Sequence, residues 1–318
     1  MSTLNDGLIF DIHDNIVYIM GHADLDVESI IIPSEINGYP VKIIDERAFA
    51  SYRKLKNIIL PNTIIEIRSA AFYDCEDLID INIPDSVNTI GHAIFYNCTN
   101  LTDIKIPSNF CLEEIGDFIF WNCVNLKNVK LGKNIKRIGK HAFTGCLNLI
   151  NIELPQMLEY IDTGLFCGCK KLKNVKLPNH VKEIKSNAFT GCINLTELII
   201  PNSVRSIDTK AFTYCQNFKR IAIGASVTDI SFLGCIKNNL ESIDVDKNNR
   251  NYVSDNGVLF KGDEEDPFDI MILTIYPLAK KDKKYNIPSW VDCVKENAFD
   301  GAKYLEDIYF INDFKWIK

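Results

Sequence analysis

AFYDCEDLIDINIPDSVNTIGHAIFYNC, residues 71–98, presents one set of residue types twice. Phe72 and Cys75 return 23 positions later as Phe95 and Cys98. The interval of 23 residues, once lengthened to 25, continues in both directions along the chain. The phenylalanines in this register are Phe49, Phe72, Phe95, Phe120, Phe143, Phe166, Phe189 and Phe212. The chain therefore contains an internal repeat, and its fold must be one that units of this length can build.

Each copy of the repeat contains two short apolar runs and one turn. The run L-x-x-I-x-I-P, as in LTDIKIP at residues 101–107, alternates aliphatic and polar residues, which predicts a short strand with one buried face. The proline ends the strand because it cannot donate to a sheet. A second aliphatic pair, such as Val87 and Ile90, turns inward again. We predict that A-F-x-x-C forms a helical turn, since residues three apart then share one side.

A single coil of 23 residues cannot enclose its own aliphatic side chains. Coils stacked at the spacing of adjacent strands, about 4.8 Å, bury these side chains continuously. We therefore predict a solenoid of about ten coils with little helix, in which equivalent strands pair in parallel. The repeated phenylalanines and cysteines then form ladders inside it.

The two ends and one internal coil depart from the repeat. Two apolar runs around His13, Asp14 and Asn15 predict a hairpin that covers the first coil. The longer copy, IPSNFCLEEIG, predicts a surface bulge, and VLF and IMILTIYP predict two strands about an acidic turn near the C-terminus. We expect one continuous structural domain with three parts. These are the capping hairpin and first repeat at 1–45, the repeat solenoid at 46–249, and the hairpin-bearing unit with the last coil at 250–318.

The charge balance limits the partners that the chain can bind. The 318 residues contain 35 Lys and Arg against 42 Asp and Glu, a net charge of −7. This balance disfavours general binding to nucleic acid or to anionic membranes. Residues 101–190 are the exception, with 13 basic and 8 acidic residues. The N-terminus shows no signal peptide pattern and no window of about 18 apolar residues occurs, so we expect a cytoplasmic protein without membrane insertion.

Eleven cysteines raise the question of disulfides or a metal site. Only Cys167 and Cys169 lie close together in sequence, whereas metal sites use convergent pairs. Stacked coils would bring thiols within disulfide distance, so some disulfides stay an alternative to packed, reduced thiols, which we favour. His92 and His141 fall near one corner, as a ligand pair or as exposed residues. No catalytic motif is present, and we predict no catalytic residue, metal or cofactor.

The full pattern, L-x-x-I-x-I-P-x-x-V-x-x-I-G-x-x-A-F-x-x-C, resembles the BspA-like, or Treponema-type, class of leucine-rich repeat over nearly the whole chain. Residues 31–49 are similar to the first repeat of such proteins, and residues 251–299 to their hairpin-bearing C-terminal unit. The resemblance implies a leucine-rich-repeat right-handed superhelix of the α/β solenoid class. It also implies a binding role without inherited catalytic residues, in adhesion or host interaction, which makes a cell-surface or secreted location the alternative to the cytoplasm.

The outward positions of the strand run form the candidate binding surface. The third and fifth residues of L-x-x-I-x-I point away from the core by alternation, and most are polar. A partner's acidic or polar groups could bond to them one coil apart. The predicted binding residues are Asn57, Asp80, Asn82, Asp103, Lys105, Asn128, Lys130, Asn151, Glu153, Asn174, Lys176, Glu197 and Arg220. Contact with water alone would also favour polar residues here, and the corners and the C-terminal hairpin are alternative faces.

These inferences predict a monomeric, non-catalytic scaffold whose extended repeat surface recognises a protein or glycan partner. The alternative is a structural or self-associating module without a dedicated ligand.

Overall fold

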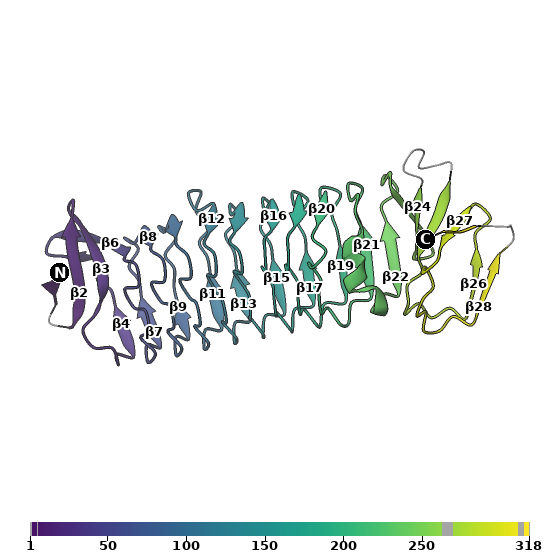
Figure 1. The fold of residues 1–318 in the computed structure, drawn as a ribbon. Coiled ribbons are helices and arrows are strands. Elements are labelled where there is room, and N and C mark those ends of the chain that lie inside the picture. Colours follow the sequence, from purple (N-terminus) through teal and green to yellow (C-terminus); the bar gives the residue numbers. More distant parts are fainter. Residues whose placement is uncertain (1, 5, 263–269, 311–314, 318) are drawn as a thin grey trace.

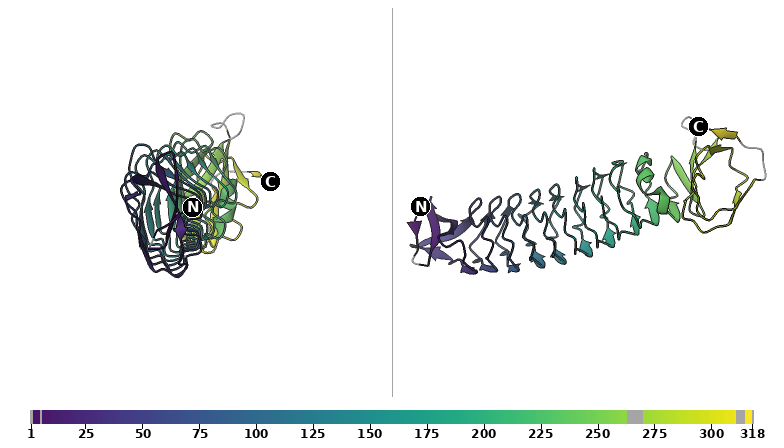
Figure 2. Two further views of the ribbon diagram at one scale, coloured as in Figure 1. Left: turned by 90° about the vertical axis from the view of Figure 1, so that its left-hand side faces the viewer. Right: turned by 60° about the horizontal axis from the view of Figure 1, so that its bottom comes forward.

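The computed structural model describes residues 2–4, 6–262, 270–310 and 315–317. The chain winds into an elongated solenoid, with each coil stacked on the one before it (Figure 1). Viewed from the N-terminal end, the coils overlap, each slightly shifted from the one before it (Figure 2). The described residues form about 13 coils of about 23 residues with parallel strands and almost no helix, which confirms the predicted fold class. There are more coils than the ten predicted because coil-like strands continue into the C-terminal segment.

The I-x-I runs form the first ladder of strands, on one side of the solenoid. Paired strands are parallel and in register, so that Lys105 lies beside Lys130 and Glu153 beside Lys176. The side chains alternate between exposed and buried, as predicted. The strands are β4 (Ser29–Ile31), β7 (Asn57–Ile59), β9 (Asp80–Ile81), β11 (Asp103–Lys105), β13 (Asn128–Lys130), β15 (Asn151–Glu153), β17 (Asn174–Lys176), β19 (Glu197–Ile199), β21 (Arg220–Ile223) and β22 (Ser242–Val245). We call the solvent side of β7 to β21 the strand face.

The second apolar pair of each coil forms a second ladder, whose solvent side we call the second face. Its short strands also pair in parallel, with isoleucines such as Ile138 and Ile184 pointing into the core. The strands are β6 (Tyr39–Ile44), β8 (Glu66–Ile67), β10 (Thr89–Ile90), β12 (Glu114–Ile115), β14 (Arg137–Ile138), β16 (Tyr160–Ile161), β18 (Glu183–Ile184) and β20 (Ser206–Ile207).

The A-F-x-x-C segment closes each coil, but the predicted helical turn is wrong. Ala70 and Asp74 adopt positive φ angles of 57° and 61°, and equivalent residues in most other coils do the same. At these residues with positive φ the backbone changes direction, so that peptide groups between them point along the solenoid axis. The peptide N–H of Phe72 therefore donates to the carbonyl of Ile94 in the next coil, at 3.0 Å. Helical segments in the described chain are limited to the 3-10 turns η1 (Ser231–Cys235) and η2 (Lys237–Asn239).

Phenylalanine and cysteine of this segment nevertheless share the buried side. Each phenylalanine ring from Phe49 to Phe212 stacks on the next, with centroids 5.4 to 5.7 Å apart. All eight rings in this stack are fully buried. The aromatic ladder predicted from the repeat is therefore the axis of the core.

An antiparallel hairpin covers the N-terminal coil, as predicted. Its strands β2 (Leu8–His13) and β3 (Ile16–His22) meet at a turn in which Asp14 and Asn15 have φ angles of 51° and 61°. Such angles are typical of a two-residue hairpin turn. Strand β3 pairs with β6, while β1 (Ser2–Thr3) and β5 (Glu35–Ile36) add short edges.

The longer copy of the repeat forms the predicted bulge. Both ladders of paired strands are interrupted here, since β11 pairs with β13 but not with β9, and β12 pairs with β14 but not with β10. The Asn109 side chain holds this loop. Its Nδ2 donates to the carbonyls of Asp85 and Val87, and its Oδ1 accepts the peptide N–H of Leu112 at 2.7 Å. The adjacent Phe110 side chain is 88% exposed.

A small sheet divides the core near the C-terminus. Strands β23 (Tyr252–Asp255), β24 (Val258–Gly262) and β25 (Met271–Ile275) are antiparallel, and β25 continues in parallel with β27 (Cys293–Lys295) and β29 (Lys315–Ile317). Two further coil strands, β26 (Lys284–Ile287) and β28 (Asp307–Phe310), pair beside this sheet. Leu259 packs into the solenoid core, whereas Val258 and Phe260 pack into a second core. The predicted hairpin is confirmed, and its acidic turn lies outside the described residues.

Candidate binding surface

All thirteen sequence-predicted binding residues are exposed on one side of the molecule. Twelve lie within the first-ladder strands, and Asn82 directly follows β9. Between them, buried residues such as Ile104 and Val175 anchor the strands to the core. The row of strands β11, β13, β15, β17 and β19 runs side by side along the solenoid (Figure 1), so the coil stacking brings these residues into one extended strip.

Side-chain amides link neighbouring coils across this strip. Asn128 Nδ2 donates to Asp103 Oδ1 at 2.5 Å, and Asn174 Nδ2 donates to Asn151 Oδ1 at 3.3 Å. Hydrogen bonds from Thr102 and then Asn128 lower the pKa of the Asp103 carboxyl. The face thus offers carboxylate, amide and ammonium groups whose positions are set by the strand register.

Shallow hollows lie between the exposed side chains. One of about 640 Å³ extends over β15, β17 and β19, with Asn174, Lys176 and Ile199 in its lining. Another of about 290 Å³ lies over β9, β11 and β13. These two hollows contain eleven of the thirteen predicted residues, whereas Asn57 and Arg220 lie beyond them.

Residues of the turns after the strands also line the hollows, and the sequence analysis missed them. Lys133 and Gln156 border a hollow of about 490 Å³, and Asn179 and Pro201 line the largest one. The sequence could have indicated them, because each turn directly follows an outward strand position. It was overlooked because only the alternating run was assigned to the surface.

The comparisons with known proteins agree with this geometry. The profile of the BspA type leucine rich repeat region, with six copies, matches residues 22–150 and 136–256. The chain belongs to the BspA-type leucine-rich repeat family. No curated protein matches it significantly.

Several solved structures are similar to this BspA-type chain. A leucine rich repeat protein of T. pallidum is 29% identical, with a TM-score of 0.56, over 61% of this chain and 91% of that one. A leucine rich cell surface protein of Faecalibacterium prausnitzii is 25% identical, with a TM-score of 0.54, over 98% and 70%. A leucine-rich repeat protein of Bacteroides ovatus shares the fold at 24% identity, with a TM-score of 0.63, over 99% and 90%. The chain is therefore similar to bacterial leucine-rich repeat proteins, one of them a cell-surface protein.

The cysteines of this BspA-type chain are all free, and seven form a buried ladder. Each buried thiol donates to the phenylalanine carbonyl of the preceding coil, as Cys98 Sγ does to Phe72 at 3.2 Å and Cys146 Sγ to Phe120 at 3.2 Å. Burial raises the pKa of these thiols, to about 12 at Cys75 and Cys215. The packed-thiol interpretation therefore agrees with the structure, but the sequence analysis missed the hydrogen bond that favours cysteine over alanine.

Each of the two candidate histidines has its own contacts within the chain. His92 Nδ1 accepts the peptide N–H of Asp117 at 2.9 Å. The His141 ring stacks on Phe118, with centroids 5.4 Å apart, and desolvation lowers its pKa. In the described ranges, no three His, Cys, Asp or Glu side chains are placed to hold a metal ion. Nor does any helix there have the length and apolarity needed to cross a bilayer.

Proposed function

We propose that this chain is a non-catalytic binding scaffold whose strand face recognises a protein or glycan partner, in adhesion or another surface interaction. The observation that carries the proposal is the exposed strip of charged and amide side chains held in register by a fully packed core. A rigid face of this kind loses little conformational entropy when a partner binds. Its likeness to a leucine rich cell surface protein supports the same role.

The test fills the largest hollow with large uncharged side chains. Asn151→Tyr together with Asn174→Tyr replaces two exposed strand-face residues with a side chain that suits strands. The double variant should lose the partners that the wild-type chain captures from extracts of its own organism, measured by quantitative mass spectrometry. Thermal unfolding should remain near that of the wild type because both positions are exposed.

The matched control places tyrosine on the second face, as Thr89→Tyr with Ser206→Tyr. This control should retain every captured partner. Capture that survives in the strand-face variant, or that fails equally in the control, would place the binding surface elsewhere.

The last coil favours a second candidate function, self-association. Ile308 is in register with the buried Tyr285, so it occupies an inward position of its coil, yet it is 37% exposed. Tyr304, four residues earlier in the chain, is half exposed. Light scattering over a range of concentrations separates the two functions, because self-association needs no added ligand and should disappear in Ile308→Lys.

A further inference from the structure

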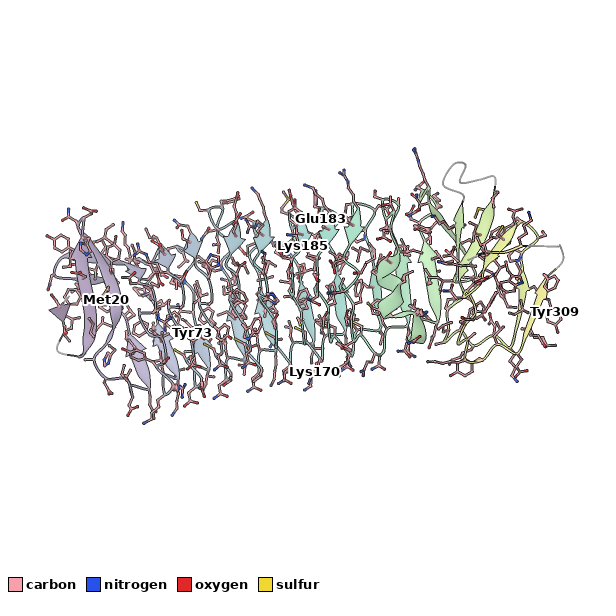
Figure 3. The ribbon with its side chains drawn as sticks, in the orientation of Figure 1. Met20, Tyr73, Lys170, Glu183, Lys185 and Tyr309 are labelled. Carbon is pink, nitrogen blue, oxygen red and sulfur yellow. The ribbon has the colours of Figure 1, made fainter. Side chains whose placement is uncertain are left out.

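Several cations of the second face are paired with carboxylates of the preceding coil. Lys136 Nζ lies 2.7 Å from Glu113, Lys182 Nζ 2.9 Å from Glu159, and Lys185 Nζ 3.2 Å from Asp162. Figure 3 shows Glu183 and Lys185 on this side of the body, with Lys170 at the opposite edge. Positive charge on the second face is thus largely compensated within the chain.

The lysines of the strand face differ in this respect. Five of them are exposed, and none forms an ion pair with a carboxylate of the described ranges; they are Lys127, Lys130, Lys133, Lys173 and Lys176. Lys105 alone among its neighbours is paired, with Asp85 at 3.3 Å. These lysines occupy the coils of β13 and β17, in a chain whose net charge is −7. These five lysines outnumber Glu153, the acidic strand-face residue of the coil between them, so this part of the face carries net positive charge in a chain that is net negative.

An apolar region borders these lysines toward the C-terminus. The lining of the largest hollow includes Lys176, the carboxylates of Glu153 and Glu197, and the apolar Ile199 and Pro201. The Ile199 side chain is 73% exposed, although it lies within strand β19. Its neighbour in register on β21 is Ala222, whose side chain is small.

We propose that the strand face binds an acidic protein segment, whose carboxylates contact Lys130, Lys133 and Lys176 and whose apolar side chain packs on Ile199. This inference rests on the proposed function and specifies the partner. The lysines unpaired in the described ranges favour an anionic partner. The exposed Ile199 favours a polypeptide, because acidic polysaccharides carry no large apolar side chain that could pack on it. Salt should weaken the complex, because exposed charges are screened.

The probes are a random copolymer of glutamate and tyrosine, poly-L-glutamate, and polygalacturonate, titrated by fluorescence anisotropy or calorimetry. We expect the copolymer to bind tighter than either other polymer, and to weaken as salt increases. Lys130→Gln with Lys176→Gln should reduce copolymer affinity about two- to thirtyfold, the effect of losing two exposed ion pairs. Ile199→Ser should reduce affinity for the copolymer and leave poly-L-glutamate unchanged.

The matched control, Lys136→Gln with Lys182→Gln, removes the same charge from the second face and should keep wild-type affinity. An equal loss in this control would overturn the proposal, since binding would then follow net charge alone. Tighter binding of polygalacturonate would also overturn it, in favour of a glycan. If the tyrosine variants abolish capture of natural partners while the lysine variants leave it intact, the scaffold function stands and the acidic-segment proposal fails.

Discussion

At the scale of single residues, the buried thiols link neighbouring coils by hydrogen bonds in addition to packing. Cys75 Sγ donates to the Phe49 carbonyl at 3.0 Å, and Cys215 Sγ to the Phe189 carbonyl at 3.1 Å. The Phe189 carbonyl also accepts the peptide N–H of Cys192, the cysteine of its own coil. A cysteine side chain is small enough for the core and still satisfies an acceptor that the turn leaves exposed to the next coil.

The thiol ladder makes the folded state sensitive to alkaline pH. Burial raises the pKa of Cys75 and Cys215 from an ordinary 9.0 to about 12, so the folded chain keeps protons that the unfolded chain releases. Their contribution to stability is therefore complete below pH 9 and falls between pH 9 and 12, by about 1 kcal/mol per pH unit for each thiol. Cys75→Ser with Cys215→Ser should make this decrease in the free energy of unfolding, measured with urea, less steep, while the five other buried thiols maintain the remainder.

Serine keeps a donor for the two carbonyls and does not ionise in this range. Cys111→Ser, at an exposed thiol, serves as the control and should retain the wild-type pH dependence. An unchanged slope in the double serine variant would show that Cys75 and Cys215 do not contribute to the pH dependence.

Single residues also show what the sequence could predict. The period placed Phe143 and Cys146 in the core, and strand alternation placed Asn128 and Lys130 in solvent; both are confirmed. The thiol donors could not be inferred in this way, because their acceptors lie 26 to 28 residues away and depend on the offset between stacked turns. Whether the thirteen surface residues bind a partner stays a prediction, since exposure alone does not distinguish a ligand contact from a hydrated side chain.

At the scale of elements, the closing turn is where sequence reasoning failed. A spacing of three residues fits a helical turn, and it equally fits consecutive tight turns with left-handed residues between them. Asn97 and Asn122 have positive φ angles of 60° and 57°, and asparagine tolerates this region better than most residues. The Asn and Gly residues at this position were therefore a signal against helix that the aromatic spacing obscured.

Close contact between neighbouring elements explains some glycines of the repeat. A Cβ atom on Gly116 would lie 2.2 Å from the carbonyl oxygen of Gly91 in the coil before it. Gly116→Ala should therefore lower the free energy of unfolding by about 1 to 3 kcal/mol, measured by urea denaturation, because the two backbones must separate.

Gly234→Ala provides the comparison for this substitution. Nothing lies within 4 Å of a Cβ atom at Gly234, so this change should alter stability by less than about 0.5 kcal/mol. Equal effects at both positions would mean that helix and turn propensity, rather than coil spacing, sets the cost.

At the scale of the whole molecule, strand β24 divides the hydrophobic interior in two. The sequence predicted one continuous structural domain, and a pattern of short apolar runs cannot show that alternate residues of one strand serve different cores. Trp121 reports on the solenoid, and Trp290, whose ring centroid lies 4.7 Å from that of Phe260, reports on the C-terminal core.

Two reporter variants test whether these cores unfold separately. One retains Trp121 alone and the other Trp290 alone, with phenylalanine at the remaining tryptophans. Val294→Ala truncates a fully buried side chain of the C-terminal core, which should cost about 2 kcal/mol. The urea midpoint seen by Trp290 should fall while that seen by Trp121 stays constant. A common shift at both tryptophans would instead support one cooperative unit.

The hydrogen bonds between coils have a consequence for how such molecules change over evolutionary time. Each internal coil presents one set of backbone donors and acceptors to the coil before it and the complementary set to the coil after it. Recombination that duplicates or deletes one 23-residue unit therefore leaves every junction chemically intact. The reach of the molecule then changes only in discrete increments of one strand spacing, about 4.8 Å. Natural variants of this chain should therefore differ in length by whole units.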